Sequence, residues 1–391
     1  MEPTHFNEVS LVPGRDFSVQ RGHPWIFSGA IKKDPKSPRE GELVRVLSSS
    51  GRVLGIGLYS SRGSIAVKML SFSDEPINLD FWKKRVTSAV DRRRSIGLLS
   101  NSETSAYRLI NAEGDSVPGL IVDFYTDTAV LQFQNPALEN FAGEISTALV
   151  ETIEPRVRRV FLKSNDQENN PSRYLWGEAG VGEMKENGYK FVVDWERGQK
   201  TGFFLDQREN RRLLGSFCRD KRVLNAFCYT GGFSIYALGG GATSVVSLDS
   251  SKPALQLLEK NIESNFPSAT HETVSEDFFK YMQQLSSQFE VIVLDPPAFA
   301  KDRRAVKSGI KGYRSINEAA FRALPKGGVL FTFSCSQLVS REDFRNVVAE
   351  SAAAAGRPAR VLHQLFQAPC HPVHLSHPEG EYLKGLVVRV D

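Results

Sequence analysis

Two short motifs place a candidate nucleophile and a candidate carboxylate at the ends of predicted strands. Cys335 lies in FSCSQ, 333–337, and Asp295 lies in LDPPAFAK, 294–301. Because proline cannot continue a β-ladder, the two prolines after Asp295 predict a rigid corner that turns its carboxylate toward a pocket. A lone cysteine is more often a small buried hydrophobic residue, but the serines on both sides of Cys335 argue against apolar surroundings. We therefore expect a thiol nucleophile and a carboxylate in one pocket.

A second set of residues fits a nucleoside. In NAFCYTGGFS, 225–234, a predicted strand ends in the turn Gly231-Gly232, where backbone amides and a helix N-terminus can approach a ligand closely. Alone this is a weak signal, since glycine pairs also close ordinary turns. Asp249 ends the next predicted strand and can bind both ribose hydroxyls, and Asp277 ends the one after it, where it suits the exocyclic amine of adenine. The ordered set predicts a nucleoside ligand.

A basic segment follows the carboxylate corner directly. KDRRAVKSGIKGYR, 301–314, has six basic residues and one acid, a net charge of +5. A solvated loop would explain these charges, but a glycine-containing basic loop at the mouth of a nucleoside pocket favours phosphodiester binding. The basic side chains are Lys301, Arg303, Arg304, Lys307, Lys311 and Arg314.

The elements that must position these residues alternate regularly from Asp206 onward. We expect helices that begin at Gly232, Lys252 and Ser340, and strands at 223–227, 245–249, 273–277, 291–297, 329–336, 361–367 and 384–390. Strand–helix alternation is typical of an open, mostly parallel α/β sheet covered on both faces. Ligands in such folds bind at the carboxyl ends of the strands, where all the residues above lie.

The N-terminal part is organised differently. Short alternating runs before residue 72 predict a small β-barrel. An amphipathic helix follows, and we interpret the charges on it as a solvated polar face; they are Lys83, Lys84, Arg85, Arg92, Arg93 and Arg94. Residues 105–195 predict an α+β middle domain that closes in a hairpin with the turn Asn187-Gly188.

The amino-acid composition limits the classes of protein to which this chain can belong. The 391 residues are 41% hydrophobic and 24% charged, which fits two or three globular domains and excludes a disordered, collagenous or coiled-coil chain. No membrane-spanning run or signal peptide is visible, so we expect a cytoplasmic protein. The net charge of +4 equals that of residues 1–72 alone, with ten basic and six acidic side chains, and is compatible with a polyanionic partner.

The cysteines and histidines do not predict a metal site. The four cysteines have no C-x-x-C spacing, so we expect thiols rather than a disulfide framework. CHPVHLSHP, 370–378, clusters Cys370, His371, His374 and His377, but its prolines and irregular spacing differ from usual zinc-ligand pairs.

The motifs NAFCYTGGFS, SLDSS, SEDF, LDPPAFAK and FTFSCSQ, preceded by GFFLDQREN, resemble the class I S-adenosylmethionine-dependent methyltransferases. More narrowly, the whole chain is similar to the bacterial and archaeal large-subunit ribosomal RNA cytosine-C5 methyltransferases. RGHPWIFSGAI resembles part of a PUA RNA-binding domain, and EYLKGL near the C-terminus also matches. The resemblance implies an α/β fold: a PUA-like β-barrel (1–72), a small α+β middle domain with a basic linker helix (73–195) and a Rossmann-like methyltransferase domain (196–391).

The resemblance also implies binding residues. With S-adenosyl-L-methionine as cofactor, it places Gln207, Arg208, Asn225, Phe227, Tyr229, Thr230, Gly231, Gly232, Asp249, Ser250, Asp277, Phe278, Asp295 and Pro296 near that molecule. We expect ribosomal RNA as substrate, contacted by Pro297, Phe299 and the basic side chains named above. The sequence leaves the oligomeric state undecided, with a homodimer as one possibility. We expect no membrane partner.

The chemistry of cytosine agrees with this set. Because C5 is a poor nucleophile, a thiolate must first add to C6, and Cys335 is the candidate. Asp295 would bond to the N3/N4 edge, and a base must remove the C5 proton. Some RNA cytosine methyltransferases carry a second cysteine in the DPP motif. Ala298 and Phe299 supply no second cysteine here, so the sequence does not identify the general base that removes the C5 proton. Phe299 could instead stack on a nucleobase flipped out of its helix.

Two alternatives remain. DPP-F corners also serve methyltransferases that act on a nitrogen such as guanine N7 or N2, where no covalent adduct is needed and Cys335 would be dispensable. The chain could also be an RNA-binding or ribosome assembly factor with a vestigial cofactor site, which would bind the cofactor without transferring a methyl group.

Overall fold

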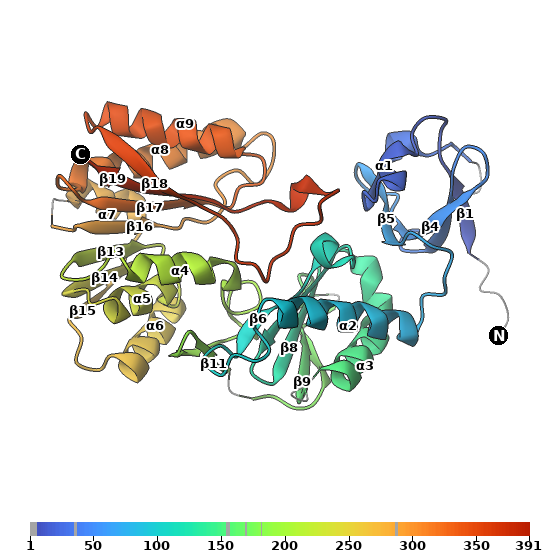
Figure 1. The fold of residues 1–391 in the computed structure, drawn as a ribbon, viewed down its shortest axis with the longest axis horizontal. Helices are drawn as coiled ribbons and strands as arrows, with labels where there is room; N and C mark the ends of the chain where they lie inside the picture. Colours follow the sequence, from blue (N-terminus) through green and yellow to red (C-terminus); the bar gives the residue numbers. More distant parts are fainter. Residues whose placement is uncertain (1–5, 35–36, 154–156, 169, 181, 286–287) are drawn as a thin grey trace. The chain divides into compact units, whose positions relative to one another are not determined.

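The computed structural model describes residues 6–34, 37–153, 157–168, 170–180, 182–285 and 288–391. The chain forms two compact units, which are described separately (Figure 1). The N-terminal unit consists of Met1–Gly182, Trp195–Gly202 and Pro369–Gly380, and the C-terminal unit of Glu183–Asp194, Phe203–Ala368 and Glu381–Asp391.

The first strands form a small closed sheet. In the order β1-β3-β4-β5-β2, the strands are β1 (Asn7–Ser10), β3 (Leu43–Leu47), β4 (Val53–Tyr59), β5 (Ile65–Ser71) and β2 (Trp25–Phe27). A bridge between Leu11 and Ile31 joins the two outer ends, which closes the sheet. Alternation along β3 puts Val44 and Val46 in the core. The predicted β-barrel is confirmed.

Helix α2 (Leu79–Ser95) follows the barrel, as predicted. Asn78 caps its first turn by accepting a hydrogen bond from the Phe81 N–H. The interpretation of its charges as a solvated face is wrong at Arg93. Arg93 is fully buried, and its guanidinium pairs with both carboxylate oxygens of Asp115 at 2.5 and 2.7 Å and donates to the Cys370 carbonyl at 2.8 Å. A buried cation requires such partners, because desolvation without them is prohibitive.

This network leads to a stability prediction. Among the described residues, Arg93→Met leaves the buried Asp115 with only Arg92 as an ion-pair partner, so we expect the N-terminal unit to lose about 3 kcal/mol of unfolding free energy. Urea unfolding followed by tryptophan fluorescence measures this unit selectively, since all four tryptophans (25, 82, 176 and 195) lie in it.

The control is the next residue in the chain. Arg94 is exposed and forms an ion pair with Asp91 on the same helix, so Arg94→Met should change the unfolding free energy by less than about 0.5 kcal/mol. Equal losses in the two variants would contradict a specific role for the buried network.

A second sheet completes the N-terminal unit. Its order is β10 (Arg173–Trp176), β9 (Arg159–Leu162), β8 (Thr128–Phe133), β7 (Leu120–Tyr125) and β6 (Ala106–Asn111). Strand β10 was not predicted, because none of its four residues is buried and no apolar alternation marks it. The helical part of this unit beside the sheet is η3 (Pro136–Phe141) and α3 (Ala142–Thr152), with Leu138, Ile145 and Leu149 buried.

The predicted hairpin is present but belongs to the C-terminal unit, not to the middle domain. It consists of β11 (Glu183–Glu186) and β12 (Tyr189–Val192), and both turn residues have positive φ, 49° at Asn187 and 86° at Gly188. The free backbone edge of β12 is bound by α6 (Lys252–Asn265): Asn261 and Asn265 each accept a hydrogen bond from one of its N–H groups. These amides hold the hairpin against α6.

The C-terminal unit is the predicted α/β sheet. Its order is β15 (His271–Ser275), β14 (Ser244–Asp249), β13 (Arg222–Ala226), β16 (Val291–Leu294), β17 (Val329–Ser334), β19 (Lys384–Val390) and β18 (Ala359–Leu365). Strand β19 pairs antiparallel with both of its neighbours, β17 and β18, and the other described pairings of this sheet are parallel. Figure 1 shows α8 (Val306–Ala323) and α9 (Arg341–Ala354) on one face, and α4 (Arg208–Gly215), α5 (Gly232–Gly239) and α6 on the other. The carboxyl ends of β13, β14, β16 and β17 therefore meet at one edge.

The expected loop at 301–314 is wrong from residue 306 onward, because α8 begins there. Glycine disfavours a helix, but here it permits close packing: a Cβ at Gly309 would lie 3.0 Å from the Ala300 Cβ, and one at Gly312 would lie 3.0 Å from the Phe299 ring. The buried face continues through Tyr313. All six basic side chains of the segment are exposed.

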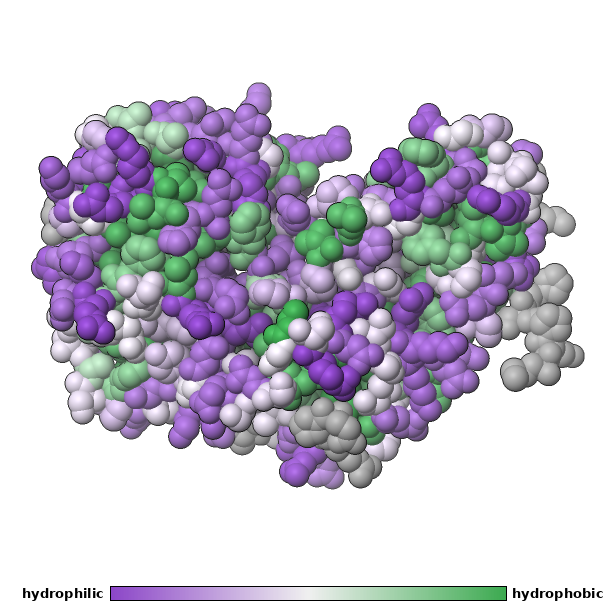
Figure 2. All heavy atoms as spheres, viewed as in Figure 1, coloured by the Kyte–Doolittle hydropathy of each residue, from purple (hydrophilic) through white to green (hydrophobic). Residues whose placement is uncertain are grey.

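The surface of the C-terminal unit is mixed. Figure 2 shows hydrophobic side chains among hydrophilic ones on the face that is in view. Its exposed large hydrophobic residues include Val361 and Leu362 of β18, the edge strand, and Phe366 just after it.

Candidate active site

The loop after β13 is locally strained. Phe227, Tyr229 and Gly231 have φ values of 59°, 48° and 84°. Left-handed backbone at two aromatic residues costs energy and is retained mainly at functional sites. Gly231 has an additional constraint, because a Cβ there would lie 2.7 Å from Leu258. The loop thus leads into the N-terminus of α5 through left-handed backbone at Phe227, Tyr229 and Gly231.

The predicted acidic residues follow two neighbouring strands. Asp249 ends β14, and its two carboxylate oxygens accept hydrogen bonds from the N–H groups of Tyr229 at 2.9 Å and Ser251 at 2.8 Å. These bonds fix the carboxylate, and each oxygen keeps a lone pair that can accept from a hydroxyl. Asp277 is exposed and caps α7 (Phe278–Tyr281) by accepting from the Phe279 N–H. Ser250 is exposed beside Asp249.

Other residues expected near the cofactor are more enclosed. The Phe278 ring is buried and packs on Phe227 with a centroid distance of 5.1 Å, so only its backbone can reach a ligand. Asn225 Oδ1 and Thr230 Oγ1 are buried without a hydrogen-bond partner within the described residues. Buried polar atoms rarely lack partners. The strained loop, the fixed carboxylate and these two atoms together fit a polar nucleoside ligand.

The carboxylate corner is held by the segment before α4. Asp295 follows β16, and its Oδ1 accepts a hydrogen bond from Gln207 Nε2 at 3.0 Å. Gln207 is itself oriented by Asn210, which donates to its Oε1 at 2.6 Å. Burial, and then the nearby negative charge of Asp206, raise the pKa of Asp295 to about 7. The Asp295 carboxyl can therefore exist as a neutral acid at physiological pH. Arg208 is also buried, and its Nε contacts Glu209 at 3.2 Å.

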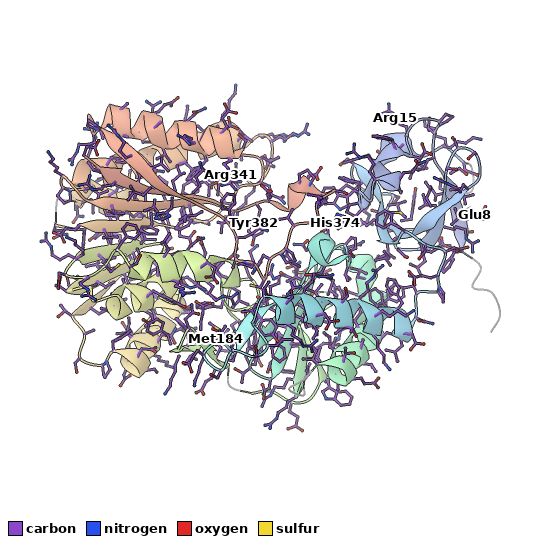
Figure 3. All side chains as sticks on the ribbon, in the orientation of Figure 1. Glu8, Arg15, Met184, Arg341, His374 and Tyr382 are labelled. Carbon is purple, nitrogen blue, oxygen red and sulfur yellow. The ribbon has the colours of Figure 1, made fainter. Side chains whose placement is uncertain are left out.

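Asp206 and Tyr382 are site residues that the sequence analysis missed. The Tyr382 hydroxyl donates to Asp206 Oδ2 at 2.6 Å, while Asp206 Oδ1 is buried without a partner in the described part of the chain. Tyr382 lies just before β19 (Figure 3). Both residues stand in motifs that the sequence did mark, GFFLDQREN and EYLKGL, but nothing local indicated that the two motifs meet.

The thiol lies next to the carboxylate corner. Cys335 follows β17 and is partly exposed, whereas Cys218, Cys228 and Cys370 are buried. Its Sγ is 3.9 Å from the carbonyl oxygen of Pro296, the residue after Asp295. The flanking serines are buried but hydrogen-bonded: Ser336 Oγ accepts from the Ala300 N–H at 3.1 Å. The two motifs thus meet as predicted.

The expected RNA-contacting residues lie beside this corner. Pro297 is exposed, and Phe299 is half-buried with its ring 4.7 Å from Tyr313 and 5.9 Å from Phe279. Lys307 and Lys311 are one helical turn apart on the exposed face of α8, and Arg314 continues this face with a 3.5 Å ion pair to Glu350.

Two family models match the chain in the corresponding regions. A PUA-like domain covers residues 9–72, and an S-adenosylmethionine-dependent methyltransferase covers residues 128–370. The ribosomal RNA large subunit methyltransferase I of Aeromonas hydrophila is 39% identical over 97% of this chain and 98% of its own length. The chain belongs to the ribosomal RNA large subunit methyltransferase I family. The same protein of Shewanella amazonensis is 39% identical over 98% of this methyltransferase and 99% of its own length.

Solved structures agree with the fold of the methyltransferase. A Streptococcus mutans protein described as a SAM-dependent methyltransferase aligns with a TM-score of 0.84 and 23% identity over 98% of this chain and all of that one. A methyltransferase structure complexed with SAH aligns with a TM-score of 0.86 and 24% identity over the same shares. The cofactor of this methyltransferase is S-adenosylmethionine.

Two further properties of the methyltransferase concern metal ligands and membrane-spanning helices in the residues that the structure describes. In these residues, no cluster of three or more His, Cys, Asp and Glu side chains could hold a metal ion. Cys370 Sγ instead lies 3.3 Å from His371 Nδ1, and the His377 ring packs against Trp25 at 4.4 Å. No helix in the described ranges has the length and apolar character needed to span a membrane.

Proposed function

We propose that this methyltransferase forms 5-methylcytosine in large-subunit (23S) ribosomal RNA. The curated relatives are ribosomal RNA large subunit methyltransferases, which supports the substrate class. The observation that carries the base and the chemistry is the 3.9 Å contact between Cys335 Sγ and the corner that contains Asp295. A thiol next to an acidic group is what addition to a pyrimidine ring requires.

In this proposal the nucleoside site holds the cofactor. Asp249 binds the ribose hydroxyls, Asp277 binds the adenine amine, and the 227–231 loop surrounds the methionine moiety. When bound, S-adenosylmethionine supplies an electrophilic methyl group. The chain must therefore make C5 of the target cytosine nucleophilic and keep the ring in place.

Cys335 and Asp295 perform this activation. The Cys335 thiolate adds to C6, which turns C5 into an enamine-like carbon. The neutral Asp295 carboxyl donates its proton as a hydrogen bond to N3 and accepts one from the N4 amine, which stabilises the charge that develops on the ring. Gln207 occupies Oδ1 of the carboxyl, so Oδ2 is the oxygen that carries the proton. After C5 loses its proton to a base, the thiolate leaves C6.

RNA binding by the exposed face of α8 leads to a prediction. We expect Lys307→Gln combined with Lys311→Gln to weaken binding of a ribosomal RNA fragment and to reduce the slope of log Kd against log salt by about 0.7 to 0.9 for each lost phosphate contact. Filter binding at several salt concentrations measures both quantities.

Arg322→Gln is the matched control on the same helix, because Arg322 is engaged by Glu318 at 2.7 Å and by the Ala354 carbonyl. Its salt slope should equal that of the wild type. A wild-type slope in the Lys307 and Lys311 double variant would exclude this face from RNA binding.

The proposed function is tested by methyl transfer from labelled S-adenosylmethionine to ribosomal RNA that lacks its native modifications. Nucleoside mass spectrometry then identifies the product. Label in 5-methylcytidine is the expected result. Label in a methylated guanosine would overturn the cytosine assignment, and cofactor binding without transfer to any RNA would indicate an assembly factor.

A further inference from the structure

Lys384 is a buried amine that the mechanism above does not use. It is the first residue of β19 and pairs with Ser334, the last residue of β17 and the neighbour of Cys335. Its side chain is 5% exposed, and Nζ donates to the Ser336 carbonyl at 2.7 Å. The amine is thus fixed at the carbonyl that directly follows the thiol residue.

The charges around this amine are unusual. Within the described residues, no carboxylate lies within ion-pair distance of Lys384, although a buried ammonium ordinarily requires an anion. Its electrostatic neighbours are the Cys335 thiol, whose ionised form favours the ammonium, and Arg341, which disfavours it. Burial is the largest influence and lowers the Lys384 pKa to about 8. Of these two neighbours, the Cys335 thiolate is the anion.

The other polar groups near the thiol do not fill this role. The Tyr313 hydroxyl of α8 shares a 2.8 Å hydrogen bond with Ser336 Oγ, and burial raises its pKa, so it stays neutral. The Arg341 guanidinium, labelled in Figure 3, stacks 4.0 Å above the Phe366 ring and donates to the Leu365 carbonyl. Lys384 is the cation whose position is tied to the Cys335 segment itself.

We propose that the Lys384 ammonium stabilises the Cys335 thiolate and so sets the pH at which the nucleophile forms. The proposal rests on the proposed function for the use of that thiolate. In the step concerned, the S–H bond of Cys335 breaks and its proton goes to solvent, while Lys384 keeps its own proton. Lys384 is a positioning residue that acts through the sulfur.

The test measures the thiol without RNA or cofactor. The rate of iodoacetamide alkylation of Cys335, followed by peptide mass spectrometry from pH 5 to pH 10, gives the midpoint of thiol ionisation. We expect Lys384→Met to raise this midpoint by about 1 pH unit, which slows alkylation about tenfold below it. Lys384→Arg keeps the cation and should stay closer to the wild-type midpoint. The buried Cys218 serves as an internal control for unfolding.

A Lys384→Met protein that keeps wild-type cofactor affinity by calorimetry and the wild-type alkylation midpoint would overturn the proposal. If this variant does not fold, the reciprocal measurement decides. Competitive acetylation of Lys384 should give a lower amine pKa in Cys335→Ala than in the wild type, and an equal pKa would refute the pairing.

The two proposals fail in different ways. A shifted alkylation midpoint together with methylguanosine as product would preserve the ammonium–thiolate pair and reject cytosine chemistry. An unshifted midpoint together with 5-methylcytidine as product would reject the ammonium–thiolate pair and preserve cytosine chemistry.

Discussion

Cys335→Ala is expected to abolish 5-methylcytidine formation, with a loss of about four orders of magnitude or more in single-turnover methyl transfer. The reason is that removal of a covalent nucleophile leaves only binding and positioning to act on the ring. Labelled methyl transfer to unmodified ribosomal RNA measures the loss. Cofactor affinity should be unchanged, because Cys335 lies after β17 and the nucleoside site follows β13 and β14.

A matched control and a trapping experiment make this result specific. Cys218→Ala removes a buried thiol that only donates to the Leu214 carbonyl, and it should retain wild-type transfer. RNA that contains 5-fluorocytidine at the target should form a covalent adduct with the wild type, because fluorine at C5 cannot leave as a proton does. Cys335→Ala should form none. Active transfer without an adduct in the wild type would reject the covalent mechanism.

Asp295→Asn is expected to lower methyl transfer by about 100- to 1000-fold, the usual cost of removing one group that stabilises developing charge. In the wild type, activity that depends on the neutral Asp295 carboxyl should fall as the pH rises through about 7. This fall should be absent from the residual activity of the variant. Asp302→Asn, at an exposed carboxylate a few residues along the same segment, is the control and should keep the wild-type pH profile.

The same substitution should stabilise the fold. The pKa of Asp295 is raised from 3.8 to about 7 in the folded protein, so ionisation costs stability there. The gain in Tm from Asp295→Asn should therefore grow between about pH 4 and pH 7 and stay constant above it. A gain that does not vary with pH would show that the carboxyl is not perturbed in the folded state. Lost activity with gained stability is typical of a group retained for function.

Local patterns predicted most of the C-terminal unit because the residues that mark the start and end of each helix or strand lie within a few positions of it. Proline and glycine marked the corner at Asp295 and the turn at Gly231, and both were found where predicted. The error at 301–314 has the opposite cause. Gly309 and Gly312 favoured a loop in the sequence analysis, but α8 tolerates them because Ala300 and Phe299 pack against them. This contact is not visible in the local sequence.

The residues that sequence reasoning missed depend on distant partners. Tyr382 reaches Asp206 across 176 positions, Lys384 reaches the Ser336 carbonyl across 48, and Arg93 reaches the Cys370 carbonyl across 277. No periodicity or spacing rule connects such pairs. Their roles follow from burial and from the scarcity of other partners, which only the folded chain defines.

The antiparallel strand β19 has a consequence for biosynthesis. It lies between β17 and β18, although both of these strands precede it in the chain, so the sheet stays divided until β19 has been translated. Until then β17 keeps one unpaired edge and β18 has no partner strand in this sheet, which exposes the nascent chain to misassociation. The same late strand brings Lys384 to the segment that carries Cys335. Under the role proposed for Lys384, a nascent or C-terminally truncated chain would therefore hold its thiol in an unactivated form, and the reactive nucleophile would arise only when the sheet is complete.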